Sequence, residues 1–105
     1  MVVLCVNDPA VMKAWAADQK VDGSIITFVA DTRCEFTKAV GMPIEHPGPL
    51  EVLGSIRCKR FVLVVEDGIV KHVRVSEGPD DPAGDADPSG PVTAETLVDN
   101  VLKLL

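Results

Sequence analysis

Three cysteines, Cys5, Cys34 and Cys58, are the residues of this 105-residue chain whose side chains could do redox chemistry. A free cysteine otherwise behaves as a small hydrophobic residue in a core, so the residue type alone leaves both roles open. Their number is odd, their spacings are wide and no C-x-x-C motif occurs, so we expect no structural disulfide framework. His46 and His72 add no zinc-ligand spacing, and we therefore expect no metal site and no bound cofactor.

The overall charge and hydropathy exclude several classes of protein. The chain carries 16 Asp plus Glu against 10 Lys plus Arg, a formal net charge of -6, so the basic face that nucleic acid requires is not expected. No apolar run approaches the roughly 18 residues of a membrane helix, and the first residues lack the features of a secretory signal. With the cysteine pattern, this predicts an intracellular protein of a reducing compartment, cytoplasmic or organellar and not secreted.

The elements that must position these cysteines alternate between strand and helix. Residues 2–6 are small and β-branched apolar residues, typical of a strand buried on both faces. Residues 9–19 have helical apolar spacing, with Asp8 as the cap and Pro9 at the first helical position. A second strand is expected over residues 25–30.

A short helix is expected next. Thr32 and Glu35 have the spacing of a capping box, and Gly41 is placed to end the helix. Residues 42–54 hold three prolines and predict an irregular segment, with one short helical turn near residues 50–54.

The second half of the chain begins with a hairpin. Residues 60–66 and 69–75 read as strands on either side of the two-residue turn Asp67-Gly68. Thr93 is expected to cap a final helix whose apolar stripe packs on the rest of the domain. Alternation followed by a hairpin and a helix predicts an α/β sandwich within a single domain over residues 1–105.

An acidic, proline- and glycine-rich loop is expected over residues 76–92. Residues 76–91 hold four prolines, three glycines and five acids, and no Lys or Arg occurs from residue 76 to residue 102. The acidity of the chain therefore belongs to this loop, which we interpret as solvated and mobile rather than as an interaction site.

Several segments together resemble one family of thiol peroxidases. They are VNDPAVMKAW at residues 6–15, FVAD at 28–31, EFTKAVG at 35–41, RCKRF at 57–61 and VVEDGIVK at 64–71. In this order, and with nearly this spacing, they resemble the V-N-D-x-x-V-x-x-x-W, R-x-[KR]-R-[FY] and hairpin segments of the type II, peroxiredoxin-five-like peroxiredoxins. The resemblance covers almost the whole chain outside the acidic loop, but only roughly the last three-fifths of a family member.

The resemblance implies a thioredoxin-like α/β/α sandwich that is incomplete in these residues. Its N-terminal strands and its active-site helix have no counterpart here. One missing strand would lie between residues 2–6 and 60–66, and each of those strands would expose unpaired backbone groups at a cost of about 1–3 kcal/mol per buried group. Either the sheet closes up, or another chain fills the slot, or the natural protein is longer.

The P-x-x-x-[ST]-x-x-C segment that carries the peroxidatic cysteine of the family is also unmatched. Cys5 follows a strand, without a helix N-terminus to lower its pKa. Cys34 has the anion of Asp31 three residues before it, and Cys58 has Glu51 where the motif needs proline. None of the three cysteines therefore fits the peroxidatic role.

The supporting residues of the family site do have counterparts. A peroxidatic thiolate needs a cation that lowers its pKa and donors that stabilise charge on the peroxide oxygens. The motif assigns this role to Arg60, whose alternative is an ordinary ion pair at the start of a strand. Arg57 and Lys59 are expected to be solvent-exposed charges. The apolar wall that seats the peroxide corresponds to Pro49, Val52 and Leu53, for which plain core packing is the alternative.

The resemblance thus implies an antioxidant thiol peroxidase that reduces hydrogen peroxide and alkyl hydroperoxides. Glutaredoxin or thioredoxin would be its electron donor, and a homodimer is implied. Because no residue fits the peroxidatic cysteine, we expect the chain as given to be inactive, and whether it is itself an enzyme stays open. The alternatives are a non-catalytic thioredoxin-like fragment that binds a partner or dimerises, and a peroxidase that uses Cys34 or Cys58 in a rearranged site.

Overall fold

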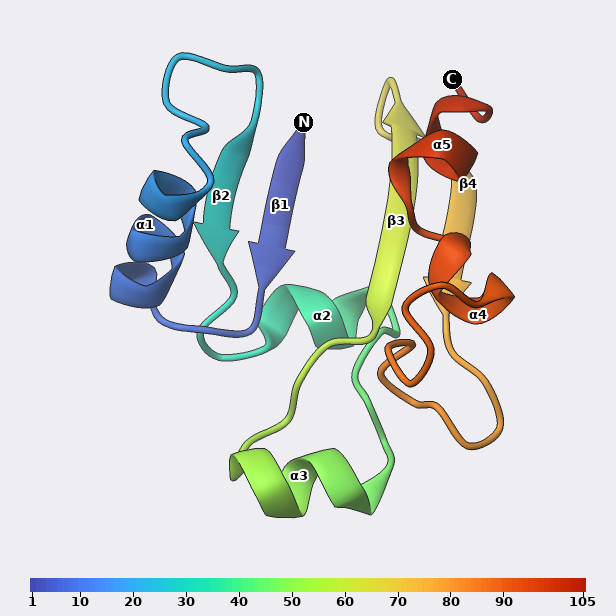
Figure 1. Cartoon of the computed structure of the whole chain (residues 1–105). Helices are drawn as coiled ribbons and strands as arrows, with labels where there is room; N and C mark the ends of the chain where they lie inside the picture. Colours follow the sequence, from blue (N-terminus) through green and yellow to red (C-terminus); the bar gives the residue numbers. More distant parts are fainter. The chain divides into compact units, whose positions relative to one another are not determined.

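Strands and helices follow one another as the alternating pattern predicts. The computed structural model describes residues 1–105, with β1 (Val2–Cys5), α1 (Pro9–Asp18), β2 (Thr27–Ala30), α2 (Glu35–Ala39), α3 (Pro47–Leu53), β3 (Arg60–Glu66), β4 (Ile69–Ser76), α4 (Pro91–Ala94) and α5 (Val98–Leu102) (Figure 1). The chain divides into two units, Met1–Cys58 and Lys59–Leu105. The expectation of one domain over residues 1–105 stays a prediction.

The four strands form two separate two-stranded sheets. β1 pairs in parallel with β2, and β3 pairs antiparallel with β4. The three outcomes expected for a missing central strand, a sheet that closes up among them, stay predictions. One edge of β1 and one edge of β3 have no strand partner.

In the first unit, α1 packs against the parallel sheet. Asp8 caps α1 by accepting a hydrogen bond from the Val11 N–H at 2.9 Å, as predicted. The α1 face toward β2 buries Met12, and Trp15 contacts Phe28 of β2 edge-on with ring centroids 4.8 Å apart. The helix and its cap thus arise from local sequence signals, and one aromatic pair with one buried methionine fixes the helix on the sheet.

The capping box predicted for α2 is not formed. The N-cap is Cys34, with a left-handed φ of 59°, and Asp31 supplies the cap instead. The carboxylate of buried Asp31 accepts hydrogen bonds from the backbone N–H groups of Phe36 at 3.1 Å and Thr37 at 2.8 Å. The Thr32 hydroxyl donates to the Asn7 carbonyl at 3.1 Å. A carboxylate offers two strong acceptors to two N–H groups, so it displaces the single hydroxyl of Thr32.

The segment after α2 returns to the end of the first unit. α3 begins beyond His46, whose Nδ1 accepts a hydrogen bond from the Gly48 N–H at 3.0 Å, and is longer than the turn predicted there. The Ile44 N–H donates to the Arg57 carbonyl at 2.8 Å, and Pro43 forms an isolated antiparallel bridge with Cys58. These contacts hold residues 57 and 58 in place within the unit.

In the second unit, β3 and β4 form the predicted hairpin. Its register runs from Arg60 opposite Ser76 to Glu66 opposite Ile69. The turn residues Asp67 and Gly68 have φ values of 52° and 76°, which are the positive values that a tight two-residue hairpin turn requires.

The prediction of a single C-terminal helix capped by Thr93 is wrong. The chain forms two short helices, α4 and α5, and Thr93 lies inside α4 rather than at its cap. The Thr93 hydroxyl lies within hydrogen-bonding distance of two carbonyl oxygens of the acidic loop, those of Gly84 at 2.6 Å and Asp87 at 2.9 Å. The Thr93 hydroxyl, which we predicted to cap a helix, therefore connects the acidic loop to α4.

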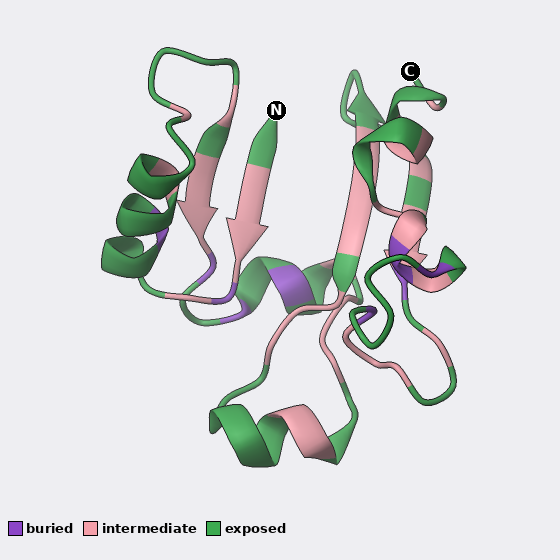
Figure 2. Cartoon of the chain, in the orientation of Figure 1, coloured by how far each residue is buried: buried purple, intermediate pink, exposed green.

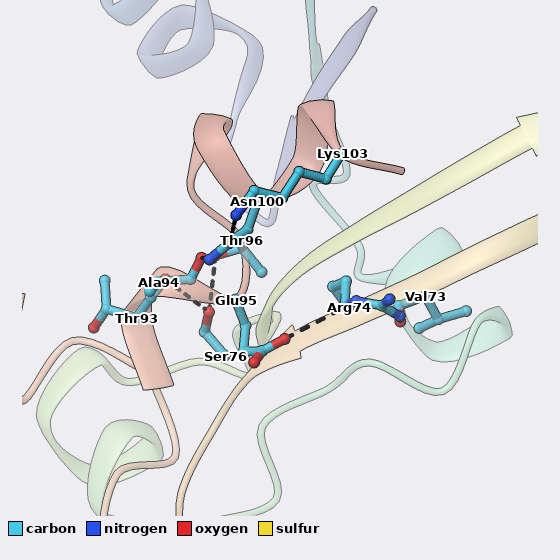
Figure 3. A network of polar contacts seen from close by, with 9 residues as sticks. All are labelled: Val73, Arg74, Ser76, Thr93, Ala94, Glu95, Thr96, Asn100 and Lys103. Carbon is cyan, nitrogen blue, oxygen red and sulfur yellow. Dashed lines mark hydrogen bonds and ion pairs between the residues drawn. The ribbon is translucent and has the colours of Figure 1, made fainter. Parts of the chain in front are cut away.

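The buried residues of the second unit are polar or glycine. Ser76 and Thr93 are buried there together with two loop glycines, whereas the other residues of β3 and β4 are half-buried or exposed (Figure 2). Figure 3 shows the Ser76 hydroxyl against that of Thr96 at 2.8 Å, with the Thr93 carbonyl as a further partner at 3.3 Å. These contacts of the Ser76 hydroxyl thus join the end of β4 to α4 and to Thr96 in the segment between α4 and α5. None of the helices of the chain has the length and apolar character to cross a membrane.

Candidate functional site

Arg60, the supporting residue that the motif assigns, is the first residue of β3 and is exposed. It forms no ion pair, whereas Arg74 on the neighbouring strand lies 4.0 Å from Glu95. The ordinary ion pair at the start of the strand, which was the alternative for Arg60, is not formed. A guanidinium without a carboxylate partner keeps its full charge and its N–H donors for another anion.

The three residues predicted to form an apolar wall lie on α3. Pro49, Val52 and Leu53 have the i, i+3, i+4 spacing that places side chains on one face of a helix. Val52 is 82% exposed and Leu53 is 54% exposed, so neither packs in a core here, whereas Pro49 is half-buried and core packing stays open for it. Their role against a peroxide stays a prediction.

The expectation of solvent-exposed charges at positions 57 and 59 is wrong. Arg57 is half-buried, and its Nη1 donates to the Val6 carbonyl at 2.5 Å. Val6 follows the last residue of β1, so its carbonyl has no partner in the strand ladder and accepts the guanidinium instead. Lys59, also half-buried, forms an ion pair with Glu77 of its own unit at 3.1 Å.

Arg57 belongs to a thiol site in the first unit that sequence reasoning missed. A side-chain hydrogen bond with Cys58 is the largest cause that lowers the pKa of Cys5 to about 6, against the opposing effect of burial. The Asn7 side-chain amide donates to the same sulfur at 3.8 Å, and the positive charge of Arg57 and the N–H of Val6 add to the shift. These contacts favour the thiolate form of Cys5.

The partner thiol is shifted in the opposite direction. The hydrogen bond to Cys5 raises the pKa of Cys58, burial raises it further, and only the backbone N–H groups of Val6 and Cys58 oppose this. The two thiols therefore titrate as a coupled pair in which the thiolate is favoured on Cys5 and the proton on Cys58. The two cysteines lie far apart along the chain, so the sequence does not show that they form a pair. The only signal in it is the presence of Asn7 and Arg57 close to Cys5 and Cys58 in sequence.

An open cleft of about 420 Å³ lies beside this pair, at the carboxyl ends of β1 and β2. Asn7 and Arg57, which both act on the Cys5 sulfur, are among its lining residues. Its charged lining residues are Arg33, Lys38, Arg57 and Asp8. Three cations against one acid make this cleft a positive surface on a chain whose net charge is negative.

Cys34 lines the same cleft, but its side chain is buried. It is only 5% exposed and adopts the left-handed conformation at the start of α2. This matches the role of a small buried hydrophobic residue. No group of three or more His, Cys, Asp and Glu side chains could hold a metal ion.

A parallel β–α–β unit followed by a helix, together with a β-hairpin and C-terminal helices, is the element order of an α/β protein. The family model described as Redoxin matches residues 1–88. The chain therefore belongs to the redoxin family and is a peroxiredoxin of the thioredoxin-like superfamily, which confirms the resemblance and the α/β fold class predicted from the sequence.

Named relatives agree with this membership. The chain is 43% identical over 74 residues to the peroxisomal membrane associated protein 20 of Schizosaccharomyces pombe, covering 68% of this chain and 44% of that protein. It is 33% identical over 90 residues to the hybrid peroxiredoxin hyPrx5 of Haemophilus influenzae, covering 83% of this chain and 35% of that protein. The chain spans less than half the length of these relatives.

Solved structures show the same relation. Reduced Prx3 from Vibrio vulnificus in complex with hydrogen peroxide has a TM-score of 0.70 and 28% identity, covering 97% of this chain and 52% of that one. Peroxiredoxin 5 from Alvinella pompejana has a TM-score of 0.60 and 32% identity, covering 77% of this chain and 49% of that one.

Proposed function

We propose that the 105 residues are the C-terminal part of a thiol peroxidase that reduces hydrogen peroxide and alkyl hydroperoxides. The observation that carries this is the RCKRF segment, within the residues matched by the redoxin model, with an Arg60 that no carboxylate neutralises. The structure neighbour from Vibrio vulnificus, described as a complex with hydrogen peroxide, supports the substrate class.

In this reaction a peroxidatic thiolate, supplied by a P-x-x-x-[ST]-x-x-C segment outside these residues, attacks one peroxide oxygen. The S–O bond forms as the O–O bond breaks, and water or an alcohol leaves. Arg60 favours the thiolate and donates to the oxygens while charge moves between them. Pro49, Val52 and Leu53 form the apolar seat. A thiol reductant, glutaredoxin or thioredoxin, then returns two electrons.

The same proposal includes three finer points. The whole protein forms a homodimer and acts inside the cell, in the cytoplasm or an organelle; relatives described as peroxisomal and chloroplastic support an organelle. Residues 1–105 alone are inactive as a peroxidase, because no cysteine among them fits the peroxidatic motif.

The alternative is a non-catalytic thioredoxin-like module that binds a partner or dimerises. The unpaired edges of β1 and β3 favour it, because each offers a row of backbone donors and acceptors to another strand. The intact mass of the protein from its native source separates the two. A mass well above 11.2 kDa, with peroxide consumption driven by dithiothreitol, supports the peroxidase, whereas a mass of 11.2 kDa without turnover supports the module.

In a chain that carries the peroxidatic segment, Arg60→Lys is expected to lower kcat/KM for hydrogen peroxide about 10- to 100-fold, because a point charge replaces fixed guanidinium donors. Arg74→Lys is the matched control, since Arg74 lies on the partner strand of the same hairpin and pairs with Glu95. Its kcat/KM should stay within about twofold of the parent enzyme. Equal losses in both variants would contradict the role of Arg60.

A further inference from the structure

We propose that Cys5 and Cys58 form a redox-active dithiol that exchanges with small anionic disulfides, glutathione disulfide being the chemical type. Neither cysteine fits the peroxidatic motif, so this activity is separate from the peroxide reduction proposed above. It resides entirely within the first unit and can be measured on residues 1–105 without the peroxidatic segment.

The backbone around Val6 brings the two sulfur atoms together. The Val6 N–H lies within hydrogen-bonding reach of both Cys5 and Cys58, and a side-chain hydrogen bond between the two thiols is the largest cause of both pKa shifts. The carbonyl of the same residue, Val6, accepts a hydrogen bond from the guanidinium of Arg57, which is the residue before Cys58. An isolated antiparallel bridge between Pro43 and Cys58 also holds this segment. Both thiols are half-buried, so they are held in place and still accessible.

The first step is attack by Cys5. Its thiolate forms a bond to one sulfur of the small disulfide, the S–S bond of that disulfide breaks, and one thiolate leaves and takes a proton from solvent. Cys5 is suited to this step, because the optimum attacking thiol has a pKa near the ambient pH. The product is a mixed disulfide between Cys5 and half of the small disulfide.

The second step is attack by Cys58. The hydrogen bond with Cys5 is the largest cause that raises the pKa of Cys58, and that bond and the charge of the Cys5 thiolate are both lost once Cys5 is in a disulfide. Cys58 then loses its proton and bonds to the Cys5 sulfur, and the second thiolate leaves. The two protein thiols are oxidised by two electrons to one disulfide, and the small disulfide is reduced to two thiols.

The adjoining cleft favours an anionic partner. Arg33, Lys38 and Arg57 line it, and Asp8 is its only acid. Glutathione disulfide carries carboxylates, so it should reach Cys5 faster than cystamine, a disulfide that carries two ammonium groups. We expect a rate ratio of about tenfold at low salt, which falls as ionic strength rises.

The direct test treats the reduced 105-residue chain with glutathione disulfide, followed by alkylation and peptide mapping by mass spectrometry. We expect two glutathione molecules released per chain, a Cys5–Cys58 disulfide, and a Cys34 that is still alkylated. A disulfide that involves Cys34, intermolecular disulfides alone, or a stable Cys5–glutathione adduct in the wild-type chain would overturn the proposal. Cys34→Ser is the matched control and should behave as the wild type.

Two variants of Cys58 separate its two roles. Cys58→Ser keeps an O–H donor to Cys5 but cannot resolve the mixed disulfide, so one glutathione is released and a Cys5 adduct accumulates. Cys58→Ala also removes the donor, and alkylation of Cys5 by iodoacetamide at pH 6 should become about tenfold slower than in Cys58→Ser. Equal alkylation rates in the two variants would contradict the contact between the thiols.

The wild-type chain provides a test that does not depend on folding of a variant. Alkylation of Cys5 should rise with pH through a midpoint near 6, because Cys58, Asn7 and Arg57 favour its thiolate. Asp31 is the acidic residue that directly follows the neighbouring strand β2. Its carboxylate already accepts hydrogen bonds from the N–H groups of Phe36 and Thr37. A midpoint near the ordinary thiol value of 9.0 would overturn the proposal.

Discussion

Replacing Gly84 by alanine is expected to lower the free energy of unfolding of the second unit by about 3 kcal/mol or more. Gly84 has a φ of +69°, and a Cβ atom there would overlap the carbonyl oxygen of Ser76 and lie 2.6 Å from the Ser76 Cβ. The added methyl group therefore meets backbone, which cannot move aside as a flexible side chain can.

Ser76 is held too firmly to give way. It is the last residue of β4, pairs in register with Arg60, and is 0% exposed. Its hydroxyl interacts with that of Thr96 (Figure 3). The Thr93 hydroxyl in turn donates to the carbonyl of Gly84. Displacing Ser76 would break the hydroxyl network that ties the acidic loop and α4 to the hairpin, so the loss should reach the whole unit.

Gly68→Ala is the matched control. Gly68 also has a positive φ, +76°, in the same unit, but a Cβ atom there would meet nothing within 4 Å. Only the conformational cost of about 1 kcal/mol remains. Urea unfolding of the two variants followed by circular dichroism gives the comparison. If Gly84→Ala prevents folding, Thr93→Val, which removes one hydroxyl, should still fold with a loss of about 2 kcal/mol. Equal losses for Gly84→Ala and Gly68→Ala would contradict the packing argument.

Replacing Asp31 by alanine is expected to destabilise the first unit by about 2–4 kcal/mol. The substitution leaves the N–H groups of Phe36 and Thr37 without their acceptor at the start of α2, in a part of the unit where Thr37 is fully buried. Asp8→Ala is the matched control, because Asp8 caps α1 through a single exposed hydrogen bond. It should cost about 1 kcal/mol in the same urea titration. A loss for Asp31→Ala no larger than that for Asp8→Ala would show that the buried carboxylate is not the cap of α2.

The same carboxylate makes stability depend on pH. Burial opposes the charge on Asp31, but hydrogen bonds from the N–H groups of Thr37, Phe36 and Glu35, together with the Thr37 side chain, outweigh it and hold the pKa of Asp31 below its usual value of 3.8. Because the folded-state pKa is lowered, the stabilisation is complete above the unfolded pKa and is lost as the pH falls through the folded one. The difference in unfolding free energy between the parent chain and Asp31→Asn should therefore be constant at neutral pH and shrink below about pH 4. A difference that stays constant down to pH 3 would contradict this assignment.

Local signals in the sequence determined most of the elements. Asp8 and Pro9 start α1 through contacts within a few residues, and the turn at Asp67-Gly68 sets the hairpin register by its own backbone preferences. RCKRF, VNDPAVMKAW and the other matching segments together predicted the family, because a family resemblance depends on residues in order along the chain. For these features, the residues that interact are also neighbours in the sequence.

Where two local signals compete, or where partners are distant, only the tertiary structure decided. The sequence predicted Thr32 and Thr93 as helix caps. In the structure the Asp31 carboxylate caps α2 instead of Thr32, and the Thr93 hydroxyl donates to a carbonyl of the acidic loop. Cys5 and Cys58 gave no sign of a pair, because nothing along the chain indicates that the end of β1 meets the segment after α3. The thiolate on Cys5 depends on that meeting, since a neighbouring donor and a cation shift a pKa only when folding brings them within a few ångströms.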